Sequence, residues 1–191
     1  MSLILASTSS IRAHMLEAAG VRFTAAPPLL DEQPIKRDHD RDGRSLALKL
    51  AEAKAASVGK DGWVIGSDSV VEVEGAPYSK PRDRHEAAAH LAHFSGRQMN
   101  LSSAVALARE GHVDWSVADT ATLTFRHLSQ AFIDEYLDHE WPEVGYCVGV
   151  FRMEGRGVTL FERIEGSHFT ILGMPLLPLL GALRQRGLLT S

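Results

Sequence analysis

The sequence predicts an α/β fold, because strand-like and helix-like segments follow one another along the chain. Two observations support this class. Near the N-terminus, a short apolar run at residues 3–6 leads directly into a helical pattern that continues to Gly20. In the second half, two long apolar segments meet at residues 109–112, as in a β-hairpin. With 191 residues, 45% of them hydrophobic and 23% charged, the chain fits a single domain, residues 1–191, with a sizeable core.

The element boundaries follow from apolar spacing and from residues typical of caps. We expect strands near residues 2–7, 21–26, 62–67, 69–74, 97–109, 112–125, 146–152 and 157–164. We expect helices near residues 9–19, 43–58, 83–94, 129–139 and 175–186. Gly20 is a typical helix stop, and Asp83 with Glu86 resembles a capping box. Ser129 fits the cap of the fourth helix, and Pro175 suits the first turn of the last.

An acidic residue interrupts one of the most strand-like runs in the chain. Asp68 lies in the middle of WVIGSDSVV, residues 63–71. Burying an unpaired carboxylate costs several kcal/mol, so such a residue is usually paired, bound to a metal or catalytic. Gly66 removes a side chain, so the backbone can bend or a ligand can come close. The alternative is an aspartate that caps a turn after a strand ending at Gly66.

Hydroxyl residues after the first apolar run predict an anion site. Ser9 or Ser10 fits the helix N-cap, which leaves backbone N–H groups and the positive end of the helix dipole facing whatever lies beyond the strand. Arg12 lies three residues after Ser9, so both can face the same side, and its guanidinium can bind a phosphate through two hydrogen bonds. An ordinary capped helix with a solvated arginine is the alternative.

Further charged residues complete the set that a metal–triphosphate substrate requires. Asp31 and Glu32 form an acidic pair in a proline-flanked loop, and a second carboxylate converging on Asp68 would make a magnesium-type site. A solvated loop acid is the alternative, and it fits Asp31 better than Glu32. Lys54 lies near the apolar face of the second predicted helix, and the following proline holds Lys80 in an extended conformation.

Several segments share their composition, order and spacing with one enzyme family. They are LILASTSSIRAHML at residues 3–16, DE at 31–32, LAEAK at 50–54, VIGSD at 64–68, KP at 80–81, SGR at 95–97 and GMPL at 173–176. With them the chain resembles the Maf nucleoside triphosphate pyrophosphatases over nearly its whole length. FRHLS at 125–129, CVGVFRMEGRG at 147–157 and TLFERIEG at 159–166 are similar to the branch that acts on 7-methyl-GTP. In the branch acting on dTTP and UTP, a glutamine usually stands at Glu154.

The resemblance implies a Maf/ITPase-like fold, with a central mixed sheet flanked by helices and a nucleotide cleft. It implies hydrolysis of a nucleoside triphosphate to the monophosphate and pyrophosphate, as house-cleaning of modified nucleotides such as 7-methyl-GTP. For such a site we expect Asp68 to activate the attacking water. We expect Asp68 and Glu32 to ligate a divalent cation, Mg²⁺ or Mn²⁺.

The remaining site residues are expected to contact phosphate or base. Lys54 and Lys80 would neutralise phosphate charge as catalytic residues, and Glu154 would accept hydrogen bonds from a guanine base. The substrate-binding set is completed by Ser7, Ser9 and Arg12. The family usually has a proline at Ser10, a second basic residue beside Arg12, and threonine or glutamine at Ser69. The resemblance therefore implies that Ile11, Ser69 and Glu154 are the positions that set base specificity.

Composition narrows the partners. The formal net charge of −4 gives no broad basic field, which argues against nucleic-acid binding, and no P-loop motif is present. The chain has no leader pattern, and its longest uncharged stretch, residues 169–183, is too short to span a bilayer, so we expect no membrane partner and a cytoplasmic location. Its single cysteine, Cys147, fits a reducing compartment. We leave open a homodimer, a dTTP/UTP pyrophosphatase and a non-catalytic nucleotide-sensing regulator of cell division.

Overall fold

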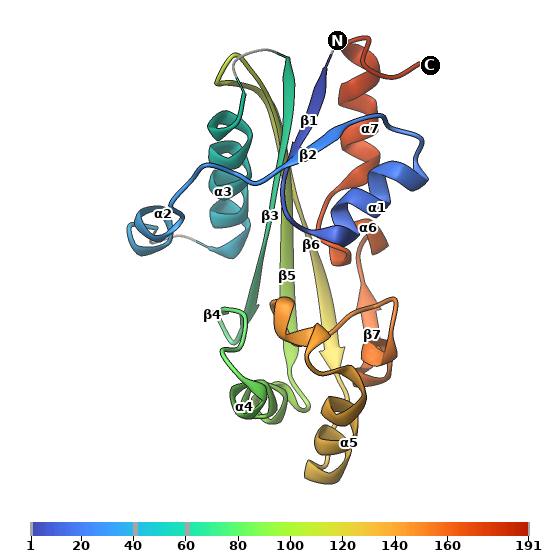
Figure 1. Cartoon of the computed structure of the whole chain (residues 1–191). Coiled ribbons are helices and arrows are strands. Elements are labelled where there is room, and N and C mark those ends of the chain that lie inside the picture. The colour runs from blue at the N-terminus through green and yellow to red at the C-terminus, as the bar shows by residue number, and fades with distance from the viewer. Residues whose placement is uncertain (1, 40–41, 60–61, 191) are drawn as a thin grey trace. The chain divides into compact units, whose positions relative to one another are not determined.

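Strands from both halves of the chain join in one mixed sheet in the computed structural model, which describes residues 2–39, 42–59 and 62–190. Within these ranges the strand order is β2 (Thr24–Ala26), β1 (Leu3–Ala6), β3 (Trp63–Val73), β5 (Gln98–Arg109), β6 (His112–Phe125) and β7 (Phe161–Glu165), and β4 (Ala76–Tyr78) pairs with β3 (Figure 1). β1 is parallel to β2 and β3. β4 is antiparallel to β3, and β7 is antiparallel to β6. The mixed sheet is therefore as predicted.

Helices flank this sheet, which confirms the α/β class. They are α1 (Ser10–Ala18), α2 (Gln33–Arg37), α3 (Gly43–Ser57), α4 (Arg84–Phe94), α5 (Gln130–Glu140), α6 (His168–Ile171) and α7 (Leu176–Gln185), with 3₁₀ turns η1 (Glu143–Tyr146) and η2 (Arg156–Leu160). Gly20, at a φ of 71°, follows the end of α1, and Ser129 Oγ accepts a hydrogen bond from the backbone N–H of Phe132. These two predicted helix boundaries are confirmed.

The chain divides into two compact units. The first comprises Met1–Ser69, Ser102–Asp119 and Ser167–Ser191, and the second comprises Val70–Leu101 and Thr120–Gly166. Because β3, β5 and β6 pass from one set of residues to the other, neither unit is a continuous stretch of chain. A single domain over residues 1–191 stays a prediction.

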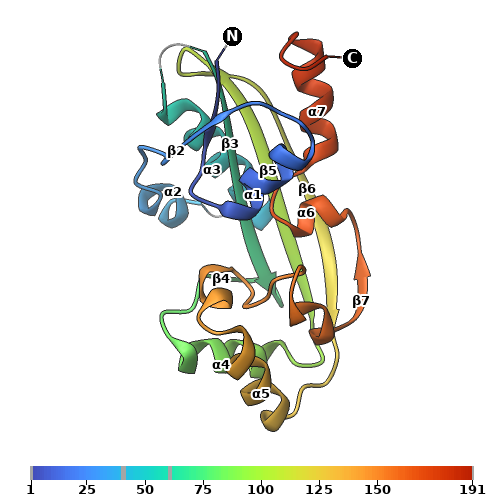
Figure 2. The same ribbon diagram turned by 45° about the vertical axis from the view of Figure 1, so that its right-hand side comes forward.

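In the first unit, α3 covers one face of the strands and α1 and α7 cover the other (Figures 1 and 2). Residues two apart in a strand point to the same face, so β1 and β3 each send alternate apolar residues toward α1 and α7. That core contains Leu3, Leu5, Trp63, Ile65, Met15, Leu16, Leu179 and Leu183. On the α3 side, Val64 packs with Ala6 and Val58.

The second unit is held by a helix pair and an aromatic cluster. Arg84 Nη2, on α4, donates to Asp134 O at 3.1 Å and Asp138 Oδ1 at 2.6 Å, both on α5. The aromatic rings form a chain in which neighbouring centroids lie 5.5, 4.6 and 5.0 Å apart, in the order Phe94, Phe125, Phe161 and Phe151. This cluster supplies apolar burial within the second unit.

Several predicted strands differ from the observed ones. The two strands expected at 62–67 and 69–74 are one strand, β3, so Asp68 lies within a strand rather than in a turn. No strand forms at 146–152, because Gly149 and Val150 have positive φ angles of 86° and 61°, which no extended strand allows. The strand expected at 157–164 begins only at Phe161, after η2.

Smaller differences concern helix starts and short elements. Ser9, not Ser10, is the N-cap of α1, and Pro175 is the N-cap of α7 rather than a residue of its first turn. The strand expected at 21–26 is reduced to β2. The sequence patterns gave no sign of α2, α6 or β4, which have five, four and three residues and are too short for a visible periodicity. The hairpin at 109–112 is confirmed, with Glu110 and Gly111 both at positive φ.

Gly66 of β3 fixes how closely α3 approaches the sheet. A Cβ atom built on Gly66 would lie 2.2 Å from the carbonyl oxygen of Ala51 and 2.3 Å from the backbone nitrogen of Ala55. Both atoms belong to the α3 backbone, which cannot rotate away as a side chain can. The sequence predicted a bend or a close ligand at Gly66; the group that comes close is a helix.

We therefore expect Gly66→Ala to lower the free energy of unfolding by about 3 kcal/mol, because α3 must move off the sheet. Gly181→Ala, within α7, is the matched control, since a Cβ there meets no atom within 4 Å. In a helix interior this control should stabilise the protein by up to about 1 kcal/mol. Urea unfolding of both variants checks the prediction, and equal effects of the two substitutions would contradict it.

Candidate functional site

A buried lysine joins two acidic residues in the first unit. Lys54 of α3 is 8% exposed, and its Nζ lies 2.5 Å from Asp68 Oδ1 and 2.8 Å from Glu32 Oε1. A buried ammonium without partners would be strongly destabilising, and here two carboxylates share it. The structure thus brings together three of the residues that the sequence assigned to one site.

The local fold explains why these side chains meet. Asp42 Oδ1 accepts a hydrogen bond from the backbone N–H of Ser45 and so caps α3. Lys54 adjoins Ala55, the residue of α3 that packs against Gly66. Asp68 follows Gly66 by two residues, so its side chain leaves β3 on the same face, toward α3. The close contact at Gly66 therefore brings Lys54 within hydrogen-bonding distance of Asp68.

Glu32 has a second cationic partner that sequence reasoning missed. Glu32 is the N-cap residue of α2, and Lys36 Nζ lies 2.6 Å from Glu32 Oε2. Burial raises the pKa of Glu32, but hydrogen bonds from Lys36 and Lys54 outweigh it and lower the pKa to about 2. The four-residue spacing of Glu32 and Lys36 could have signalled this pair, had α2 been expected. The neighbouring Asp31 is exposed and accepts a hydrogen bond from the backbone N–H of Gln33, which fits the alternative interpretation of Asp31 as a solvated loop acid.

The start of α1 presents hydroxyl groups and backbone N–H groups. Ser7 is buried, and its Oγ accepts a hydrogen bond from the backbone N–H of Ser9 at 3.1 Å. Ser9 is the N-cap of α1, and its own side chain makes no capping hydrogen bond. The first N–H groups of a helix need acceptors from outside it, so this end of α1 suits an anion. Ile11, in the first turn, is half-buried.

Arg12 is fixed by protein groups. Its Nε donates to Gly173 O at 2.9 Å and its Nη2 donates to Ser69 Oγ at 3.0 Å. Burial lowers the pKa of Arg12, while the charges of Asp68 and Glu32 act against that shift, so the guanidinium lies near both acids. The sequence predicted a phosphate-binding arginine. In the structure, two of the guanidinium nitrogens of Arg12 are already hydrogen-bonded to the backbone at Gly173 and to Ser69 of β3.

Ser69 lies in a hydroxyl network that sequence reasoning did not foresee. Its Oγ lies 2.8 Å from Ser103 Oγ, and Ser67 Oγ donates to Gly173 O at 3.0 Å. Ser103 in turn donates to Thr170 O at 2.7 Å. The paired serines inside the apolar run of β5, LSSAVALA, were the available signal for this network.

Lys80 and Glu154 belong to the second unit, and both are exposed. Lys80 lies just after β4, and Glu154 lies in the loop before η2. Burial raises the pKa of the Cys147 thiol, the charge of Glu154 raises it further, and the charge of Lys80 opposes both. Lys80 and Glu154 therefore lie in one electrostatic neighbourhood around Cys147.

Glu32 and Asp68 suit a divalent cation that is also bound by substrate phosphates. Because Glu32 Oε1 and Asp68 Oδ1 contact the same nitrogen, the two carboxylates converge on one point. Within the described ranges, no three histidine, cysteine or acidic side chains gather into a metal site. Mg²⁺ is commonly held by one or two protein carboxylates plus substrate phosphates, and this donor set fits that pattern.

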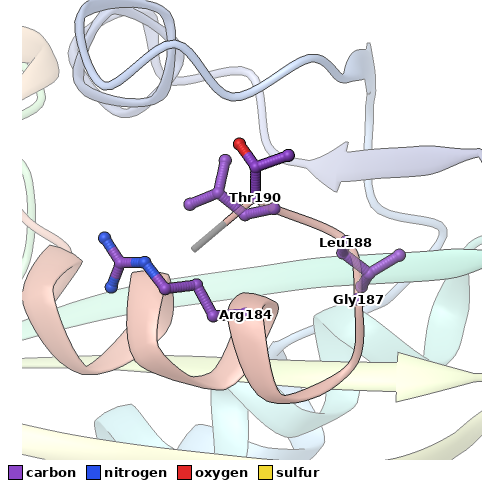
Figure 3. A pocket seen from close by; sticks show the side chains of 5 residues that line it. Arg184, Gly187, Leu188 and Thr190 are labelled. Atoms are coloured by element: carbon purple, nitrogen blue, oxygen red, sulfur yellow. The ribbon is translucent and has the colours of Figure 1, made fainter.

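Surface hollows lie elsewhere. One, at the end of α7, is lined by Arg184, Gly187, Leu188, Leu189 and Thr190 (Figure 3). Another is lined by Pro34, Ile35, Asp38 and Lys49. Neither hollow is lined by Lys54, Asp68 or Glu32, so neither coincides with this group of charged side chains. Among the helices of the described residues, none has the length and apolar character to cross a membrane.

The chain is similar in sequence to known proteins over nearly its whole length. A sequence model of the Maf-like protein family matches residues 2–186. The chain is 45% identical to a 7-methyl-GTP pyrophosphatase of Rhizobium meliloti (strain 1021), covering 97% of this chain and 96% of that protein. It is 43% identical to a nucleoside triphosphate pyrophosphatase of Granulibacter bethesdensis (strain ATCC BAA-1260 / CGDNIH1), with both chains fully covered.

The similarity to a solved structure is weaker. The nucleoside-triphosphatase, or dITP/XTP pyrophosphatase, of Mycobacterium abscessus (ATCC 19977 / DSM 44196) matches with a TM-score of 0.42 at 18% identity. The match covers 67% of this chain and 76% of that one.

The depressed pKa of Glu32 predicts a dependence of stability on pH. Its ion pairs stabilise the fold above the ordinary pKa of 4.5, and this stabilisation is lost as the pH falls toward about 2. We expect Glu32→Gln to make the free energy of unfolding fall less steeply than in the wild type between about pH 5 and pH 3. Asp31→Asn, on an exposed neighbour, should keep the wild-type slope. Urea unfolding across this range decides the point, and identical slopes for Glu32→Gln and wild type would refute it.

Proposed function

The chain belongs to the Maf-like family, and we propose that it hydrolyses nucleoside triphosphates to a nucleoside monophosphate and pyrophosphate. The observation that carries the proposal is the buried cluster of Lys54, Asp68 and Glu32, in a chain whose relatives carry that activity in their names. Of the substrates those names specify, we propose 7-methyl-GTP, which makes the reaction a house-cleaning of modified nucleotides.

Asp68 is the proposed general base. A carboxylate inside a strand is held in one direction, so it can aim a water molecule in line with the bond between the α- and β-phosphates. Lys54 Nζ donates a hydrogen bond to Asp68 Oδ1. Triphosphate oxygens offer Lys54 further negative charge, and a shift of its ammonium toward them would release Asp68 to accept a proton. Lys54 thus has two proposed roles, as partner of the base and as a phosphate ligand.

Glu32 and Asp68 are the residues that would hold a divalent cation, Mg²⁺ or Mn²⁺. When bound, such a cation supplies positive charge to phosphate oxygens in the transition state. Hydrogen bonds from Lys36 and Lys54 lower the pKa of Glu32 to about 2, so Glu32 is ionised at neutral pH, as a hard cation requires.

The phosphate chain is proposed to lie at the start of α1. Ser7 and Ser9 would donate hydrogen bonds there, together with the backbone N–H groups of the first turn. Arg12 would add positive charge from a position fixed by Gly173 O. We propose Lys80 as a further cation that neutralises phosphate charge.

Glu154 is proposed to read the base. A carboxylate accepts from the N1–H and the exocyclic amine of guanine, and its charge suits the cationic 7-methylated ring. Ile11 and Ser69 are the accompanying specificity positions, at the first turn of α1 and on β3. A preference for dTTP or UTP is the competing outcome for this part of the site.

A purely regulatory nucleotide sensor is less well supported. Binding alone needs positive charge, whereas this cluster also includes the carboxylate of Asp68, positioned beside a lysine. We place the enzyme in the cytoplasm with its nucleotide substrates, without nucleic-acid or membrane partners and with a homodimer as one allowed assembly. The formal net charge of −4 supports the absence of a nucleic-acid partner.

The proposed base predicts a loss of turnover. Asp68→Asn keeps the shape but removes the proton acceptor, so kcat should fall by roughly 10²-fold or more. Glu72→Gln, at another acidic position of β3, is the matched control and should keep wild-type activity. Pyrophosphate release by the purified variants measures both. Near-normal release by Asp68→Asn would remove Asp68 from the mechanism.

The proposed base contact predicts substrate choice. Wild-type kcat/KM should be higher for 7-methyl-GTP than for UTP or dTTP, because uracil and thymine would turn carbonyl oxygens toward Glu154. Glu154→Gln should narrow this gap by supplying a donor amide. Kinetics with the three nucleotides give the test, and a wild-type preference for UTP or dTTP would refute the role of Glu154 alone.

A further inference from the structure

The loop that carries Glu154 is held by one face of α5. Tyr136 and Glu140 are four residues apart, so they lie one turn apart on the same side of the helix, and they are only 2% and 6% exposed. Tyr136 Oη donates a hydrogen bond to Val150 O at 3.0 Å. Glu140 binds the loop a few residues further on, at Arg152.

The Glu140 carboxylate ties the chain on both sides of Glu154. Its Oε2 accepts from Arg152 Nε at 3.3 Å and Nη2 at 3.0 Å, and its Oε1 accepts from the backbone N–H of Arg156 at 3.2 Å. Burial raises the pKa of Glu140, but the hydrogen bonds from Arg152 and Arg156 outweigh it and lower the pKa. The buried carboxylate therefore stays ionised, while Glu154 between the two arginines is exposed.

The backbone of the loop is shaped around this carboxylate. A Cβ at Gly155 would lie 2.9 Å from Glu140 Oε2, and one at Gly157 would lie 2.4 Å from Arg152 O. Val150 has a φ of 61°, which is strained for a β-branched residue and persists only where its surroundings enforce it. Contacts with α5 at Val150 O and Gly155, together with the close approach of Gly157 to Arg152 O, thus set the loop conformation.

Arg152 lies within electrostatic reach of more than one acid. The hydrogen bond from Arg152 to Glu140 is the largest cause of its raised pKa, and the charges of Glu154 and Glu143 add to it. The guanidinium is bonded to the buried Glu140 and not to the exposed Glu154. A cation released from Glu140 would have Glu154 as a nearby partner, and pairing would cover the carboxylate proposed to meet the base.

We infer that Glu140 is a positioning residue for base selection, which keeps Arg152 away from Glu154. The inference rests on the proposed function, because it concerns how Glu154 is kept free to contact the base.

Glu140→Gln preserves the shape and removes the charge. We expect it to lower the ratio of kcat/KM for 7-methyl-GTP to that for UTP by about tenfold, mainly through a higher KM for 7-methyl-GTP. Arg152→Gln removes the cation instead and should keep the wild-type ratio. The double variant Glu140→Gln/Arg152→Gln should recover most of the ratio, since no cation remains to cover Glu154. Glu143→Gln, on an exposed acid of the same neighbourhood, is the control that should change nothing.

A merely structural ion pair gives a different pattern. Equal loss of selectivity in Glu140→Gln and Arg152→Gln, a wild-type ratio in Glu140→Gln, or no recovery in the double variant would each overturn the inference. Thermal unfolding shows which variants are folded, and if Glu140→Gln does not fold, the double variant and Arg152→Gln carry the test. A wild type that releases no pyrophosphate, or that prefers UTP, would count against the proposed function instead.

Discussion

The meeting of the acidic and basic groups depends on one close contact, the approach of the α3 backbone to Gly66 of β3. Two backbone atoms of α3 occupy the space that any larger residue would need there. Lys54 leaves α3 next to that contact, and Asp68 leaves β3 two residues beyond it. A missing side chain in the sheet therefore determines whether an ammonium and a carboxylate can meet.

The cluster of Lys54, Asp68 and Glu32 is not explained by its contribution to folding stability. Lys54 is buried, and burying an ion pair gains little or nothing over an apolar pair of the same volume. In the proposed reaction, the oxygens of a triphosphate would bind Lys54, and Asp68 and Glu32 would then be free for water and for a divalent cation. Lys36 forms a second ion pair with Glu32, and Arg12 adds a cation whose position is fixed by the protein.

Much of this could be predicted from local sequence, and the rest depends on tertiary contacts. The carboxylate inside β3, the capped helix after β1 and the β5–β6 hairpin follow from apolar patterns and turn residues. The strand predicted at 146–152 was wrong. Its apolar residues have the composition of a strand, but Val150 has a positive φ and its carbonyl oxygen is bound by Tyr136 of α5. Lys36 and Ser103 were missed because their partners come from other parts of the chain or from an element too short to detect.

The most direct test of the central claim is the identity of the products that the purified wild-type protein forms from 7-methyl-GTP with Mg²⁺, read by ³¹P NMR. The cluster of Lys54, Asp68 and Glu32, with phosphates at the start of α1, predicts 7-methyl-GMP and pyrophosphate in equal amounts. Formation of the diphosphate with orthophosphate, or no turnover of 7-methyl-GTP, would contradict it.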